Sequence, residues 1–181
     1  MFTKLSSLIL RSRGWTVEGS TSKKLAKKLY VVVPHTHWKD FFLGLLLRSS
    51  ENFEAGFIGK KALFRFPLGG IMRALGGIPI DRSKGRQFID QVIEKINESE
   101  RITLTIAPEG TRKRVSKLKS GFYFIAKGAN IPYVLIKFDV KNKKFVFSEP
   151  MYATNDKTID MKRVTDFFSG TVGFVEENSF F

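Results

Sequence analysis

The sequence contains no cysteine among its 181 residues, which excludes disulfides, thiolate metal sites and a cysteine nucleophile. Long apolar runs are missing too. The longest one, residues 41–47, has seven residues, whereas a membrane-spanning helix needs about 20. The first residues also lack the long apolar region and the small-residue cleavage site of a secretory signal peptide. We therefore expect a cytoplasmic protein that is at most peripheral on a membrane surface.

What the sequence does contain is a histidine and an aspartate five positions apart, His35 and Asp40, after the apolar run 29–33. That run predicts a buried strand, and residues 41–47 predict the start of a buried helix. Two side chains five apart on one helix diverge, so the pair can meet only across a turn, which Pro34 supplies. A carboxylate-held histidine can act as a general base near neutral pH. The alternative is an ordinary loop with a helix cap.

Three further motifs follow in the chain, at residues 76–82 (GGIPIDR), 107–112 (APEGTR) and 131–134 (IPYV). Together with the His35 and Asp40 pair, they resemble the four motif blocks of the glycerolipid acyltransferases, the family of 1-acylglycerol-3-phosphate acyltransferase. Each block is weak by itself, but the set in this order and spacing is specific. The resemblance extends from about residue 31 to residue 134, over more than half of the chain.

The resemblance implies that His35 takes a proton from the free hydroxyl of a lysophospholipid, while Asp40 orients the imidazole. That hydroxyl would attack the thioester of acyl-CoA or acyl-carrier protein, with 1-acylglycerol-3-phosphate as the leading acceptor and phosphatidic acid as the product. No metal or other cofactor is implied. The substrate-binding residues that the resemblance implies are Lys60, Lys61, Arg82, Glu109, Gly110, Thr111 and Arg112.

Physical chemistry supports several of these roles. The planar fork of an arginine donates two charge-assisted hydrogen bonds to a phosphate, and a glycine at position 110 lets a backbone N–H approach a ligand closely. Glu109 would hold Arg112 or the loop in place, and a purely structural ion pair is the alternative. Two residues depart from the family pattern: Pro34 stands where Asn is more usual, and Ala107 where Phe is more usual. Both leave open a different lysolipid acceptor.

Acidic residues are few: 17 of them face 31 lysines and arginines, for a net charge of +14. Such a charge indicates an anionic partner, namely a phospholipid surface, acyl-CoA, an acidic carrier protein or nucleic acid. A nucleic-acid-binding module leaves the four motifs unexplained, so we expect no nucleic acid. A membrane-binding protein without activity is disfavoured because His35 and Asp40 are both present. A serine hydrolase is disfavoured because the Gly-x-Ser-x-Gly pattern is absent.

The predicted architecture is a single α/β domain with a largely parallel or mixed sheet flanked by helices. Residues 1–28 are expected to form a basic N-terminal segment and residues 29–181 the acyltransferase domain. The apolar positions near the N-terminus predict a short helix, which either lies in a membrane interface or packs on the domain. A polar, solvated connection is expected over residues 18–28. Strands are predicted at 29–33, 53–58, 78–80, 101–106, 131–139 and 145–148, and helices at 41–47, 68–75, 83–100, 118–127 and 158–168.

Overall fold

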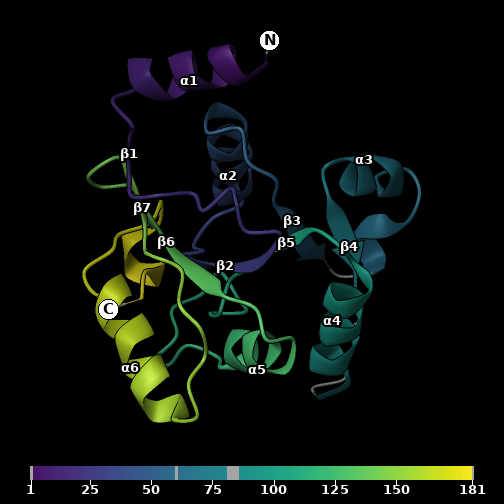
Figure 1. Cartoon of the computed structure of the whole chain (residues 1–181). Helices are drawn as coiled ribbons and strands as arrows, with labels where there is room; N and C mark the ends of the chain where they lie inside the picture. Colours follow the sequence, from purple (N-terminus) through teal and green to yellow (C-terminus); the bar gives the residue numbers. More distant parts are fainter. Residues whose placement is uncertain (1, 60, 81–85, 181) are drawn as a thin grey trace.

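A seven-stranded mixed sheet runs through the computed structural model, which describes residues 2–59, 61–80 and 86–180 (Figure 1). The strand order is β1-β7-β6-β2-β5-β3-β4, and each neighbouring pair is parallel except β6 and β7. The predicted α/β domain with a mixed sheet is therefore confirmed. The strands are β1 (Thr16–Glu18), β2 (Lys27–Val33), β3 (Gly56–Gly59), β4 (Gly77–Pro79), β5 (Ile102–Ile106), β6 (Tyr133–Asp139) and β7 (Lys144–Phe147).

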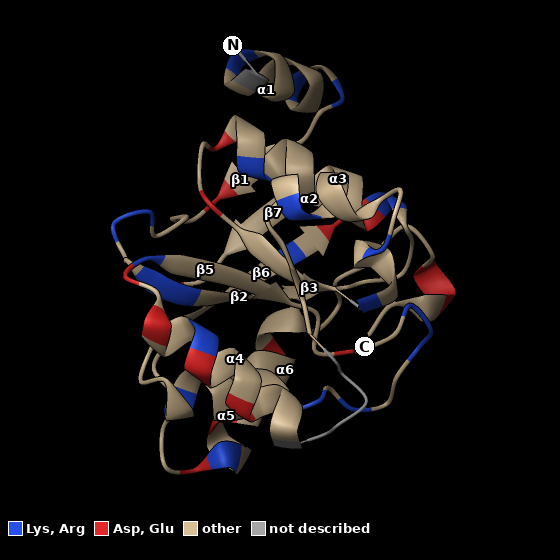
Figure 2. Cartoon of the chain, turned by 90° about the vertical axis from the view of Figure 1, so that its right-hand side faces the viewer, with Lys and Arg blue, Asp and Glu red and all other residues tan. Residues whose placement is uncertain are grey.

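Helices cover both faces of this sheet. Those of the described part of the chain are α1 (Phe2–Ser12), α2 (Lys39–Ser50), η1 (Lys61–Phe64), α3 (Gly69–Ala74), α4 (Arg86–Glu98), α5 (Gly121–Gly128), α6 (Lys157–Phe168) and η3 (Glu176–Asn178). Figure 2 shows α1 and α2 on one side of the sheet and α4, α5 and α6 on the other. A hydrophobic core lies on each face of the sheet, and alternate residues of the central strand β2 pack into each. Leu29 and Val31 pack with α4, α5 and α6, whereas Tyr30 and Val32 pack with α1 and α2.

The structure differs from the sequence prediction mainly around the N-terminal connection. The strand β1 was not predicted, and it pairs with β7, far away in the chain. Lys28 was expected in a solvated polar run, but it lies in β2 and is only 3% exposed. Its Nζ donates a hydrogen bond to the carbonyl of Leu25. Burial, with a smaller effect of the nearby Arg101, lowers the pKa of Lys28. The solvated interpretation of this end of the run is therefore wrong.

Other boundaries shift by a few residues. β3 begins at Gly56 rather than at residue 53, and α5 begins at Gly121 rather than at residue 118. Pro79 was expected at an edge, and β4 is indeed the last strand of the sheet. Ser83, the expected N-cap of the following helix, lies outside the described residues.

The N-terminal helix α1 packs on α2 through one face. Leu10 is buried in the core that α2 closes, and Ser6 is buried beside it, whereas Leu5 and Leu8 are exposed. The helix thus combines a packed face with an apolar outer face. Within the described ranges, no helix is both long and apolar enough to cross a membrane. The boundary at residue 28 between an N-terminal segment and the main domain stays a prediction.

The topology brings two loops together at one edge of the sheet. β2 lies between β6 and β5 and is parallel to both, so the carboxyl ends of these strands point the same way. The loop after β2, residues 34–38, therefore neighbours the loop after β5, residues 107–120. In open α/β sheets this edge is the usual place for a ligand site.

Candidate active site

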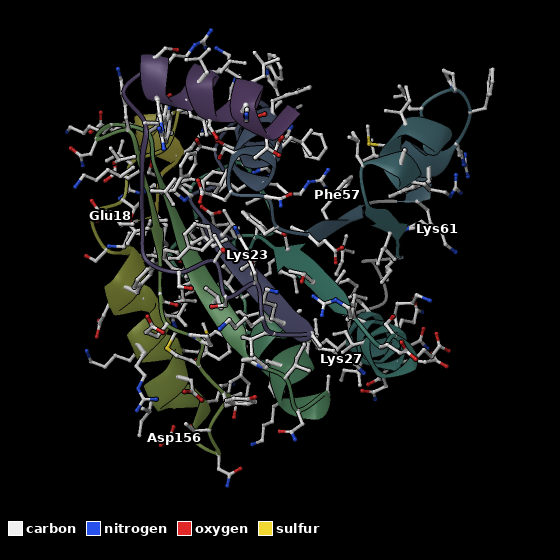
Figure 3. The ribbon with its side chains drawn as sticks, turned by 45° about the horizontal axis from the view of Figure 1, so that its top comes forward. Glu18, Lys23, Lys27, Phe57, Lys61 and Asp156 are labelled. Atoms are coloured by element: carbon white, nitrogen blue, oxygen red, sulfur yellow. The ribbon has the colours of Figure 1, made fainter. Side chains whose placement is uncertain are left out.

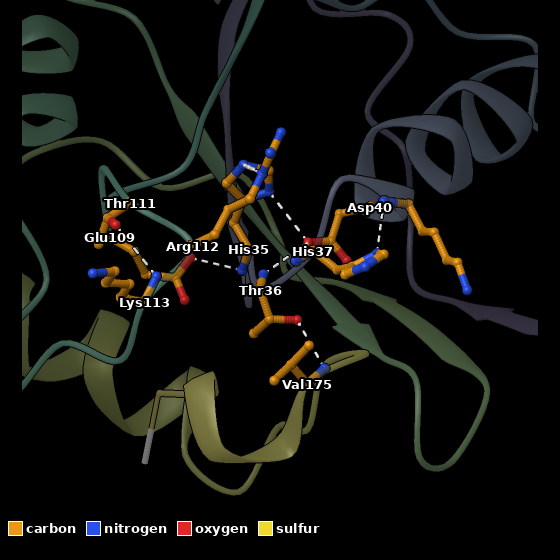
Figure 4. Close-up of polar contacts among 10 residues, drawn as sticks. His35, Thr36, His37, Asp40, Glu109, Thr111, Arg112, Lys113 and Val175 are labelled. Atoms are coloured by element: carbon orange, nitrogen blue, oxygen red, sulfur yellow. Dashed lines mark hydrogen bonds and ion pairs between the residues drawn. The ribbon is translucent and has the colours of Figure 1, made fainter.

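The loop after β2 places His35 at the carboxyl edge of the sheet, with its side chain 30% exposed (Figure 4). β2 is buried up to its last residue, Val33, and Pro34 ends it. The helix α2 starts four residues after His35, at Lys39. The predicted turn between His35 and Asp40 is therefore present, and it turns the Asp40 side chain back towards the loop.

Asp40 organises this loop through one carboxylate oxygen. Its Oδ2 accepts hydrogen bonds from the backbone N–H groups of Thr36 and His37, each at 2.7 Å. The same oxygen lies 3.3 Å from Nδ1 of His35. Asp40 is only 5% exposed. A buried carboxylate that accepts two backbone hydrogen bonds has little freedom to move, so it fixes the imidazole beside it.

The neighbours of His35 select one tautomer of the neutral ring. Arg112 donates from Nε to Nε2 of His35 at 3.4 Å, so Nε2 carries the lone pair. Nδ1 then carries the proton and faces the carboxylate of Asp40. This is the tautomer that a general base requires, because the lone pair is on Nε2, where Arg112 contacts it.

Glu109 supports the same loop from the loop that follows the neighbouring strand β5. Its Oε2 accepts a hydrogen bond from the backbone N–H of His35 at 2.7 Å, and the residue is 1% exposed. Glu109 and Arg112 thus each contact His35, in place of the ion pair with one another that the sequence suggested as an alternative. Through its contact with the His35 N–H, Glu109 holds the loop after β2. A direct contact of Glu109 with a substrate stays a prediction.

Burial raises the pKa of Glu109 to about 8; the hydrogen bond from His35 opposes this shift, and the charge of Asp40 adds to it. The folded protein favours the protonated form of Glu109. Its contribution to stability is therefore fully present at a pH below the pKa that Glu109 has in the unfolded chain. That stability is lost as the pH rises towards 8, by at most about 1.4 kcal/mol per pH unit. We therefore expect Glu109→Gln to gain stability relative to the unsubstituted protein as the pH rises from 5 to 8. Urea unfolding at several pH values gives the free energy of unfolding of both proteins. The same dependence of this free energy on pH in both would contradict the prediction.

Gly110 and Thr111 shape the turn between Glu109 and Arg112. Gly110 has a φ of +67°, a conformation that favours glycine, and a Cβ there would meet the Nζ of Lys119 at 2.7 Å. The Oγ1 of Thr111 accepts a hydrogen bond from the N–H of Lys113. The turn thus brings the amino group of Lys119 close to the backbone of Gly110.

Of the remaining predicted residues, only Lys61 lies in the described part of the chain, and no contact there joins it to this cluster. Lys61 is exposed at the start of η1, which follows β3, the strand beyond β5. Lys60 and Arg82 lie outside the described residues. Within the described part of the chain, no three His, Asp or Glu side chains are grouped closely enough to hold a metal ion.

The sequence analysis missed a second support of the loop, the C-terminal segment 171–180. The Oγ1 of the buried Thr36 accepts a hydrogen bond from the N–H of Val175, 139 positions away. Gly173 lies against the same loop, and its N–H donates to the hydroxyl of the buried Ser179. No local pattern could have indicated these contacts, because each residue is an unremarkable small or polar one in its own neighbourhood.

Gly173→Ala should destabilise the protein by about 1–3 kcal/mol, because the added methyl has no room. A Cβ on Gly173 would lie 2.6 Å from Oγ1 of Thr36 and 2.9 Å from Cγ of Pro34. Gly121→Ala is the matched control, since nothing lies within 4 Å of a Cβ there. Thermal unfolding compares the two variants. Equal melting temperatures would show that the segment yields without cost.

Comparisons with known proteins bear on the family and the fold of the chain. A family model described as Acyltransferase matches residues 14–137. The structure is similar to the crystal structure of the 1-acyl-sn-glycerophosphate (LPA) acyltransferase PlsC from Thermotoga maritima, with a TM-score of 0.63 and 19% sequence identity. That match covers 92% of this chain and 74% of the other, and at such low identity it speaks for the fold alone. Among curated proteins, no sequence matches this chain significantly.

Proposed function

Because this chain belongs to the PlsC-like glycerolipid acyltransferase family, we propose that it transfers a fatty acyl group from a thioester to a lysophospholipid. The donor in this proposal is acyl-CoA or acyl-carrier protein. The acceptor is 1-acylglycerol-3-phosphate, and the product is phosphatidic acid. The observation that carries the proposal is the His35 imidazole, held at Nδ1 by Asp40 and presenting Nε2 at the carboxyl edge of the sheet.

The proposed reaction is one direct transfer. Nε2 of His35 takes the proton of the acceptor hydroxyl as the oxygen attacks the thioester carbonyl, which gives a tetrahedral oxyanion. The C–S bond then breaks, the new ester forms, and the imidazolium returns the proton to the departing thiolate. Asp40 stabilises the imidazolium during this sequence because its carboxylate lies 3.3 Å from Nδ1. No further cofactor takes part in the proposed steps.

Arg112 must release His35 before the base can work, since its Nε occupies the lone pair of Nε2. We propose that the phosphate of the acceptor draws this exposed guanidinium away and so couples acceptor binding to the freeing of the base. The surrounding loop offers an anion further positive charge, and it carries the basic residues Arg112, Lys113, Arg114, Lys117 and Lys119. Family resemblance assigns phosphate binding to Arg82, Lys60 and Lys61 as well.

The proposal includes peripheral attachment to an anionic membrane surface, where a lysophospholipid resides. The exposed Leu5 and Leu8 on α1, together with Lys4, Arg11 and Arg13, support this part of the proposal. Sedimentation with vesicles that contain anionic phospholipid tests it in a chain that lacks residues 2–13. Unchanged sedimentation would leave α1 with only a packing role.

A thioester-consumption assay tests the proposed reaction. The purified chain is mixed with acyl-CoA or acyl-carrier protein and with one acceptor at a time, and both free thiol and new ester are measured. We expect thiol release that depends on the acceptor and is fastest with 1-acylglycerol-3-phosphate. Faster turnover of another lysolipid would correct the acceptor alone. Thiol release that ignores every acceptor would point to hydrolysis, and no release from folded protein would refute the proposal.

A further inference from the structure

The segment formed by η1 and α3 exposes large apolar side chains at its tip. Phe66, in the turn between these helices, is 99% exposed. Three more apolar side chains are exposed around it, and we call the four together the apolar prong: Leu63, Phe66, Leu68 and Ile71. Figure 3 shows this segment standing apart from the rest of the domain. A contiguous group of exposed apolar residues on a folded domain marks an interaction surface.

At its base, the segment that carries the prong is packed against the domain. Phe64 is buried beneath it, and glycines on both sides make room for its ring: a Cβ on Gly59 would lie 2.7 Å from the ring, and one on Gly77 2.9 Å. Arg73 donates to the carbonyl of Phe64 at 3.4 Å, and its guanidinium lies 5.7 Å from the ring centre. The exposed side chains are therefore presented by a packed element.

The charged residues of the segment that carries the prong have one sign. Residues 55–80 contain no aspartate or glutamate. Lys61, Arg65 and Arg73 are all exposed on the segment that carries the prong. An apolar tip on a segment with exposed cations fits a surface that is anionic outside and apolar inside.

The prong also stands near the candidate active site. β3 is parallel to β5, so η1 leaves the sheet at the same carboxyl edge as the loops of His35 and Glu109. Between them, a row of aromatic contacts joins Trp38 to Phe42, Phe42 to Phe41 and Phe41 to Phe57 in β3. Trp38 and Phe42 are both exposed. A membrane surface in contact with the prong would thus extend towards the candidate active site.

We propose that the apolar prong inserts Phe66 into the outer acyl region of an anionic phospholipid bilayer, with Lys61, Arg65 and Arg73 on the head groups. This inference rests on the proposed function, because a lysophospholipid acceptor is the reason for the active site to face a lipid surface. It adds a second membrane contact, distinct from α1. An acidic carrier protein is the competing partner for a basic, apolar surface.

Because the chain has no cysteine, one site can be labelled in the full-length protein. An environment-sensitive fluorophore is placed on Phe66→Cys or, as a control, on Thr158→Cys, an exposed position in α6 at the other side of the molecule (Figure 1). With vesicles of equal parts phosphatidylcholine and phosphatidylglycerol, the label at position 66 should shift to the blue and the control should not. The absence of a shift at position 66 would overturn the proposal. A shift caused by acyl-carrier protein without vesicles would do so in favour of the competing partner.

A second measurement uses Phe66→Ser, which keeps Phe64 and the base of the segment. Its partition onto the same vesicles should fall about tenfold to a hundredfold, because one buried phenyl group is lost. Acyl transfer to a lysolipid in vesicles should fall, whereas transfer to a short-chain, monomeric lysolipid should not. Equal loss on both would make Phe66 part of the acceptor site and refute the prong. The fluorescence shift needs no turnover, so it separates failure of the prong from failure of the proposed reaction.

Discussion

Replacing His35 with alanine should lower the steady-state rate of acyl transfer by two to four decades, the usual loss when a general base is removed. The backbone of the loop should survive, because Asp40 and Glu109 hold it through the N–H groups of Thr36, His37 and His35, which the substitution keeps. Thiol release from acyl-CoA measures the rate, and circular dichroism confirms that the variant is folded.

The second histidine of the same loop is a matched control. His37 is of the same type and only two positions away, but its Nδ1 accepts a hydrogen bond from the N–H of Lys39, and its ring lies near Trp38 and Phe174. Its side chain is not paired with the Asp40 carboxylate. His37→Ala should therefore lose far less activity than His35→Ala. If His37→Ala proved inactive and His35→Ala stayed active, the assignment of the base would be wrong.

Asp40→Asn completes this test. The amide oxygen can take the place of Oδ2 and still accept from the backbone, but a neutral amide cannot stabilise an imidazolium as a carboxylate does. We expect a clear loss of turnover together with some loss of stability, because Asp40 also accepts from Thr36 and His37. Full activity in a folded variant would reduce Asp40 to a structural support of the turn.

Local patterns predicted the part of the site that lies on consecutive residues. The apolar run of β2, Pro34 and the apolar start of α2 foretold a strand, a turn and a helix, and this order places Asp40 near His35. A strand, a turn or a helix start can be predicted from the sequence because each depends on residues that are close together in the chain. The single α/β domain followed similarly from alternating strands and helices.

Contacts between distant residues escaped this approach. The hydrogen bond from the His35 N–H to Glu109 spans 74 positions, and that from the Val175 N–H to Thr36 spans 139. Both depend on which strands become neighbours, and that is a property of the whole fold. The expectation of a solvated Lys28 failed for the same reason, since pairing with β5 and β6 buried the strand that carries it.

The largest remaining effect concerns Arg112. Its substitution should weaken binding of a phosphate-bearing acceptor and, in the opposite direction, free the His35 base. With a phosphate-bearing acceptor, Arg112→Ala should lower kcat/KM by about one to two decades, which corresponds to roughly 1.5–3 kcal/mol for a lost charge-assisted contact. The loss should appear mainly in the KM of the acceptor. The KM of the acyl donor should change much less.

An acceptor without phosphate isolates the second effect. Arg112 donates to Nε2 of His35 at 3.4 Å, so it competes with the acceptor hydroxyl for the lone pair of the base. With a monoacylglycerol, Arg112→Ala should therefore keep or increase the rate, because the base is released without a phosphate. Arg112→Lys retains the charge but not the planar fork, so it should recover only part of the lost affinity for phosphate. An equal loss with both acceptors would show that Arg112 acts on the loop rather than on the phosphate.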